Sequence, residues 1–290
     1  MKKRSLRDII EQGDVSSLQR VLDDADDDIS AIFNQRFEEN SSPLHAAVWF
    51  GQSEIAEELL DWGCPIDLRD NAGATAFHYS VWKNNIDIMM MLLEKGADVY
   101  DLDNKDNTAL HLAARKGFKA IAVMLIARGL NVNSADVDGN TPLHKAAMEG
   151  RTVMVLELLE HGARLMATNN EGMTALHLAC LNGNTETAEA LLDAGIPIGE
   201  LDTHGRTPYH MACLRFNEET ITMLLNRGCD IDVKAADGRT GAESVAIRED
   251  RSKMTAMLSH IFNEREQKAK NVARKKQQLS DLKVALKDGI

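Results

Sequence analysis

The sequence predicts an all-α solenoid, in which short helix pairs stack along almost the whole chain. A four-residue word, Ser/Thr–Pro/Ala–apolar–His, recurs every 33 residues without insertion or deletion. A glycine falls 21 residues after each of these Ser or Thr residues. The composition, 44% hydrophobic but only 4% aromatic, suits closely packed helices and argues against an all-β sandwich. The word begins at Ser42, Thr75, Thr108, Thr141, Thr174 and Thr207, and a degraded copy begins at Thr240.

Each word predicts the start of one helix pair. The Ser or Thr hydroxyl can cap free backbone N–H groups, and a following proline, as in Thr141-Pro142, fits the first helical turn. Apolar residues then recur at helical spacing and end in a pair such as Leu59-Leu60. The glycine after that pair, such as Gly63, is expected to end the second helix in the left-handed conformation. An extended, turn-rich hairpin then leads to the next word.

Two residues depart from this pattern at the end of the first helix. Asn84 and Phe216 stand where the other four units have glycine. Asparagine tolerates the left-handed conformation, so Asn84 needs no special account. For Phe216 we expect a different turn, in which Asn217 takes the left-handed backbone angles instead.

The spacing and the words together resemble the ankyrin repeat, from about residue 5 to about residue 262. The resemblance implies a solenoid of six full repeats over residues 42–239. Residues 1–41 are expected to form a degenerate N-terminal capping repeat with an acidic insert. Residues 240–263 are expected to form a degenerate C-terminal capping repeat, because a solenoid needs polar, atypical end units to stay soluble.

Residues 264–290 are predicted to form a charged, net-basic helical tail. Val272, Leu279 and Leu286 fall at seven-residue steps, which is too short a run to establish a coiled coil. Three roles stay open for this tail: a solvated helix, a helix that dimerises or binds a partner, or a segment that folds back on the acidic hairpins.

Bulk properties exclude several classes of function. The formal charge of −12 repels phosphate, which argues against nucleic acid or an anionic membrane as the partner. No segment approaches the roughly 20 apolar residues of a membrane span, and charged residues interrupt the N-terminus too early for a signal peptide. The four cysteines form neither a disulfide framework nor a paired metal site. We therefore expect a reducing compartment, the cytoplasm or the nucleus.

The histidines do not form a catalytic or metal site by their spacing. Six of the nine belong to the repeated word, and neighbouring words lie too far apart to share a zinc ion. The resemblance implies a structural role for these six. His161, His204 and His260 have no carboxylate or cysteine constellation, and no phosphate loop or nucleophile elbow is present. We expect no enzyme activity, no cofactor, no metal and no small-molecule substrate.

Partner binding is expected where the repeat leaves side chains free. The resemblance implies a groove formed by the last turn of each first helix and by the hairpin tips. Five of the six residues that open the last-turn pairs are large and apolar, which predicts an exposed apolar stripe. The alternative is that they only pack against neighbouring hairpins. The predicted partner-binding residues are Trp49, Phe50, Tyr79, Trp82, Lys83, Arg115, Lys116, Met148, Leu181, Leu214 and Arg215.

The hairpin tips are acidic, which predicts attraction of a partner with a basic face. The alternative is that the repeat simply favours Asp and Asn in these turns. The acidic residues are Asp67, Asp70, Asp101, Asp103, Asp136, Asp138, Glu171, Asp202 and Asp237.

The predicted function is that of a non-catalytic protein-interaction module or adaptor. Two alternatives stay open. One is a structural or assembly subunit of a larger complex, or a cytoskeletal linker. The other is a host-targeting effector of an intracellular microbe. The sequence assigns no oligomeric state.

Overall fold

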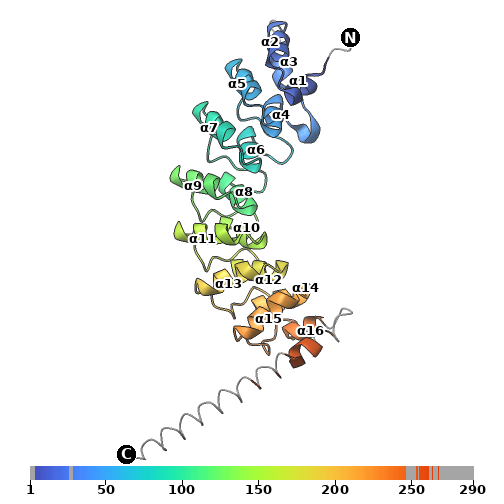
Figure 1. Cartoon of the computed structure of the whole chain (residues 1–290), viewed down its shortest axis with the longest axis vertical. Coiled ribbons are helices and arrows are strands. Elements are labelled where there is room, and N and C mark those ends of the chain that lie inside the picture. Colours follow the sequence, from blue (N-terminus) through green and yellow to red (C-terminus); the bar gives the residue numbers. More distant parts are fainter. Residues whose placement is uncertain are drawn as a thin grey trace, which may run out of the picture.

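The computed structural model describes residues 4–25, 29–245, 253, 255–260, 263 and 267, and these residues form helices and loops without a strand. The helices stand in two columns, with the first helix of each pair in one column and the second in the other (Figure 1). This arrangement confirms the predicted all-α solenoid. The six pairs are α4 (Pro43–Phe50) and α5 (Ser53–Asp61), α6 (Ala76–Trp82) and α7 (Ile86–Glu94), α8 (Ala109–Lys116) and α9 (Lys119–Ala127), α10 (Pro142–Met148) and α11 (Thr152–Glu160), α12 (Ala175–Asn182) and α13 (Thr185–Asp193), and α14 (Pro208–Arg215) and α15 (Glu218–Asn226).

Further helices cover the two ends of this stack. At the N-terminal end, α1 packs on α4 and α2 packs on α5. At the C-terminal end, α16 packs on α14, and residues 255–260 are also helical. The predicted tail, residues 264–290, lies outside the described part of the chain except for Gln267, and the domain boundaries stay predictions. The end elements are α1 (Leu6–Gln12), α2 (Val15–Asp23), α3 (Ile29–Phe33), the 3-10 helix η2 (Glu38–Asn40) and α16 (Gly241–Val245).

The repeated word caps the first helix of every pair, as predicted. In α10, the backbone N–H of Thr141 donates to Nδ1 of His144 at 3.2 Å, so histidine takes the place of the usual Glu or Gln in a capping box. The proton of the neutral ring is then on Nε2, which donates to the carbonyl of Met173 at 3.0 Å. Because Met173 directly precedes the next word, His144 ties the start of α10 to the following hairpin, and the other word histidines except His78 make the equivalent bond.

Neighbouring hairpins are also joined by one backbone hydrogen bond per unit. The amide of Asn104 donates to the carbonyl of Ala72 at 2.8 Å, and that of Asn170 donates to Asp138 at 3.0 Å. A glycine stands beside this contact: Gly139 has a φ of 77°, and a Cβ atom there would lie 2.7 Å from the amide nitrogen of Asn170. Glycine therefore meets two requirements at once, the left-handed backbone and the close approach.

One hairpin departs from this arrangement at the equivalent position. Asp106 occupies the glycine slot with a φ of 56°. In the same unit, Nε2 of His78 is buried without a hydrogen-bond partner, whereas His45 and His111 bond the following hairpin. The hydrogen bond from the word histidine is therefore missing in the unit whose hairpin has Asp106 in place of glycine.

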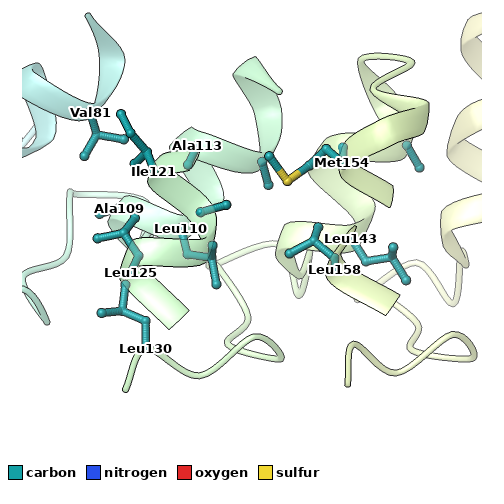
Figure 2. Close-up of a cluster of buried hydrophobic side chains, with 14 of the residues drawn as sticks. Val81, Ala109, Leu110, Ala113, Ile121, Leu125, Leu130, Leu143, Met154 and Leu158 are labelled. Atoms are coloured by element: carbon teal, nitrogen blue, oxygen red, sulfur yellow. The ribbon is translucent and has the colours of Figure 1, made fainter. Parts of the chain in front are cut away.

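The core runs continuously through the stack, because each helix pair buries its apolar faces against both neighbours. Figure 2 shows part of it, with Leu110 and Leu125 from one pair and Leu143 and Leu158 from the next. All four side chains are almost fully buried. No single unit encloses this core, so the stability of one unit depends on its neighbours.

The expectation for Phe216 is wrong. Phe216 itself takes the left-handed conformation, with φ and ψ both 51°, while Asn217 has a φ of −80°. The reason is that the Asn217 side chain is already engaged: its Nδ2 donates to the carbonyls of Cys180 and Leu181 in the preceding unit. Asn217 is held at the start of α15, so the preceding residue must make the turn.

In the degraded copy of the word that begins at Thr240, steric crowding explains why Gly241 replaces Pro or Ala. The Tyr209 ring is fully buried, and a Cβ atom on Gly241 would lie 2.6 Å from its Cδ1. The aromatic ring thus fills the space that Pro or Ala occupies in the other words. Glu243 replaces the histidine and still closes the cap, because its carboxylate accepts the Thr240 amide at 2.9 Å.

Candidate functional site

Three of the predicted site residues, Trp49, Tyr79 and Trp82, line one pocket between the first helices and the hairpins. This aromatic pocket has a volume of about 320 Å³. That is at the small end of the range for ligand pockets. Its wall is formed by Trp49, Tyr79, Trp82, Leu112, Asp70 and Asp103.

Tyr79 is the fixed centre of the aromatic pocket. Its ring meets Trp49 edge to face at 5.9 Å and His45 at 4.9 Å between ring centroids. Its hydroxyl donates to Oδ2 of Asp70 at 2.8 Å. Burial, followed by the Asp70 carboxylate, raises the pKa of Tyr79, so the phenol keeps its proton at neutral pH. The ring is thereby held between one helix and one hairpin.

Cationic side chains lie over both tryptophan rings. Nζ of Lys83 is 4.3 Å from the Trp49 ring centroid, and Nζ of Lys116 is 3.7 Å from that of Trp82. Cζ of Arg115 lies 5.7 Å from the Trp82 centroid, and its Nε donates to Glu149 at 3.0 Å. Cation–π contacts of this kind contribute about 0.5–1 kcal/mol when exposed. The following unit therefore orients both Trp49 and Trp82. These cation–π contacts were not predicted from the sequence.

The predicted apolar stripe is less exposed than expected. Trp49 is 44% exposed, whereas the other large apolar residues of the stripe are half-buried. Met148, Leu181 and Leu214 lie on α10, α12 and α14, away from the aromatic pocket. Their burial fits the alternative that they add packing between units.

The hairpin aspartates mainly serve the hairpins. Oδ1 of Asp70 accepts the amides of Ala72 and Ala74 at 2.8 and 2.9 Å, which fixes the turn. Two of the acidic tip residues, Asp136 and Asp202, are buried and form ion pairs within the chain. Burial acts to raise the pKa of Asp136, but the hydrogen bond from Lys145 lowers it overall.

The cysteines are buried thiols without disulfide bonds. Burial raises the pKa of Cys64 and that of Cys213 to about 12, so both are protonated and weakly nucleophilic at neutral pH. Within the described residues, no group of three His, Cys, Asp or Glu side chains could hold a metal ion. Among the helices that the structure describes, none is long and apolar enough to cross a membrane.

A second surface, on the outer helices, was not predicted. On α11, Val153 is 66% exposed and Leu156 is 46% exposed, and we call these two residues the outer-helix patch. A signal for it was present, because the equivalent residues of α5 are Glu54 and Glu57. A change from acidic to apolar residues at the same slots marks an exposed face that packing does not explain.

The stacked helix pairs and the lined groove define a repeat solenoid, a class of protein that presents an extended binding surface. A family model for ankyrin repeats in three copies matches residues 7–103, 99–169 and 164–235. The chain belongs to the ankyrin-repeat family. Ankyrin repeats are generic protein-interaction modules and are typically non-catalytic. A search of curated proteins finds no match to the chain.

Proposed function

We propose that this protein is a non-catalytic adaptor that holds a partner protein in the groove at α4, α6 and α8. The aromatic pocket is the observation that carries the proposal. It combines two tryptophans and a tyrosine with a concave, mostly apolar wall. Trp and Tyr are the residues most enriched among those that dominate interface energies.

The surroundings of the pocket support the same proposal. Lys83 and Lys116 lie over the indole rings, while Asp70 and Asp103 lie on the hairpin side. Charged groups around an apolar centre match the general design of a protein interface, in which a polar rim encloses a hydrophobic core. The four reduced cysteines fit a reducing compartment, the cytoplasm or the nucleus.

An assembly subunit is a second candidate, and the outer-helix patch favours it. Val153 and Leu156 lie on the second helix of their pair, whereas the aromatic pocket lies against first helices. A protein with two separate contact surfaces can bridge two neighbours in a larger complex. The adaptor function requires only the aromatic pocket.

Replacing both groove tryptophans is expected to release the partner. The experiment is affinity capture from the native lysate, with the wild type beside the Trp49→Ala/Trp82→Ala double variant. The third tryptophan provides a matched control: Trp62 is 39% exposed at the end of α5, outside the pocket. A hot-spot tryptophan contributes about 2 kcal/mol or more, so we expect retention to fall at least about thirtyfold.

The double variant and the Trp62→Ala control must both keep the helical circular dichroism of the wild type. A protein retained by wild type and by Trp62→Ala, but lost with the double variant, supports the groove. Equal retention by all three proteins would contradict it.

A further inference from the structure

We propose that the aromatic pocket receives a lysine side chain of the partner, with the ammonium group at Asp103 and the aliphatic stem against the tryptophan rings. The inference rests on the proposed function, because it names what the groove recognises. The evidence for it is a comparison of the hydrogen-bond partners of aspartates at equivalent positions in successive hairpins.

The equivalent hairpin aspartates use one oxygen in the same way. Oδ1 of Asp103 accepts the amides of Lys105 and Asn107 at 2.8 and 2.9 Å. Oδ1 of Asp136 accepts those of Asp138 and Asn140 at 3.0 and 2.8 Å. The hairpin therefore orients each carboxylate identically and leaves Oδ2 for another partner.

The partners of Oδ2 differ along the solenoid. Asp136 and Asp202 are neutralised by Lys145 and Arg206. At the aromatic pocket the partners are neutral: the Tyr79 hydroxyl for Asp70, and the Asn107 side-chain amide for Asp103 at 3.0 Å. Neither of these two carboxylates forms an ion pair in the described structure, although a carboxylate oxygen accepts more than one hydrogen bond.

Lys145 shows that an ammonium group can pair with Oδ2 of a hairpin aspartate. It is the fourth residue after Thr141, and its ammonium group contacts Oδ2 of Asp136 from the following first helix. The residue at the same slot beside Asp103 is Leu112, which lines the aromatic pocket. The pocket therefore lies where another unit places Lys145, but at this slot the chain has an uncharged leucine.

The remaining walls suit the rest of a lysine side chain. Long cationic side chains bury their methylene groups along apolar surface while the charged end stays at a polar group. Trp49 and Trp82 provide such surface and also attract cations through their ring faces. Lys83 and Lys116 already lie over these rings, so the chain itself shows that both indoles accept an ammonium group.

The single available oxygen favours lysine over arginine. A guanidinium group binds a carboxylate best through two parallel hydrogen bonds to both oxygens. At Asp103, two backbone amides already occupy Oδ1, so a bidentate pair would displace them. An ammonium group is a compact point charge that needs only Oδ2.

The test is an NMR titration of the full chain with Nα-acetyl-lysine N-methylamide as the probe. Nα-acetyl-norleucine N-methylamide, which has the same stem without the charge, is the matched control ligand. The three tryptophan indole N–H signals are the readout. We expect saturable shifts for Trp49 and Trp82 with the lysine probe only. Trp62 donates to Glu58 at 3.0 Å and reports non-specific binding of cations to acidic surface.

Two variants locate the ammonium group. Asp103→Asn should weaken probe binding about tenfold, because it removes the charge from one hydrogen bond. The change is compatible with the fold, since Asn169 occupies this slot in another hairpin. Its Oδ1 accepts the two equivalent amides, those of Glu171 and Met173. Leu112→Lys should abolish probe binding, because the new side chain would occupy the pocket as Lys145 does at Asp136.

The outcomes separate this inference from the proposed function. Equal shifts with the norleucine probe, equal shifts at Trp62, or unchanged affinity in Asp103→Asn would each overturn the lysine assignment. If the probe fails but the Trp49→Ala/Trp82→Ala variant still loses its partner, the groove stands and only the lysine assignment falls. If the probe binds and that variant keeps its partner, the pocket takes lysine but the adaptor proposal is wrong.

Discussion

Lowering the pH from 7 to 5 is expected to destabilise this protein steeply. The six histidines of the repeated word are buried, and burial lowers the pKa of each. For His144 the pKa falls from 6.5 to about 4. In the unfolded chain the same histidines titrate near pH 6.5. The unfolded state therefore binds more protons between these values, and the stability present above pH 6.5 is lost as the pH falls.

The expected size of this effect is large for a marginally stable fold. The fall in the pKa of His144 from 6.5 to about 4 alone corresponds to about 3 kcal/mol, which is lost in full by about pH 4. Urea unfolding followed by circular dichroism at pH 7.5, 6 and 5 measures the slope. A His144→Asn variant should be less stable at pH 7.5 but should show a shallower pH dependence. An unfolding free energy that is the same at pH 7.5 and pH 5 would show that the histidines are not held neutral.

Truncating one buried leucine in the middle of the stack is expected to cost about 3 kcal/mol. Leu158 on α11 is fully buried in the continuous core (Figure 2). Leu→Ala changes at such sites cost about 2–5 kcal/mol, because they combine lost burial with a cavity. Both neighbouring pairs pack on this unit, so the defect should also reduce the cooperativity of unfolding.

Leu156 provides the control within the same helix. It is 46% exposed, so Leu156→Ala should change the unfolding free energy by less than about 0.5 kcal/mol. Urea unfolding of both variants at pH 7.5 gives the comparison. Similar losses in the two variants would mean that the outer-helix patch is buried in solution, for example by self-association. A negligible loss in Leu158→Ala would contradict the described core.

Local features of this fold could be predicted because they depend on residues close in sequence. The caps at Ser42 and Thr141 and the left-handed Gly63 follow from hydroxyls, apolar spacing and glycine within one unit. The 33-residue period then fixed the stacking, since an isolated unit has no core.

Features that depend on contacts between units were not predicted. The sequence alone did not show that Lys83 lies on Trp49, or that Gly241 makes room for Tyr209. The Phe216 turn was predicted wrongly because Asn217 is held by carbonyls about 36 residues earlier in the chain. The prediction for the hairpin tips used only their charge. Whether a tip aspartate forms an ion pair within the chain depends on the residue that faces it from the next helix, such as Lys145.

The central claim is that a partner occupies the groove at α4 and α6, and hydrogen–deuterium exchange of the purified complex tests it most directly. The backbone amides of both helices and of the hairpins at residues 67–74 and 100–107 should exchange more slowly in the complex than in the free protein. The outer helices α9 and α11 should exchange at the same rate in both. Protection confined to α9 and α11 would place the partner on the outer-helix patch and contradict the proposed groove.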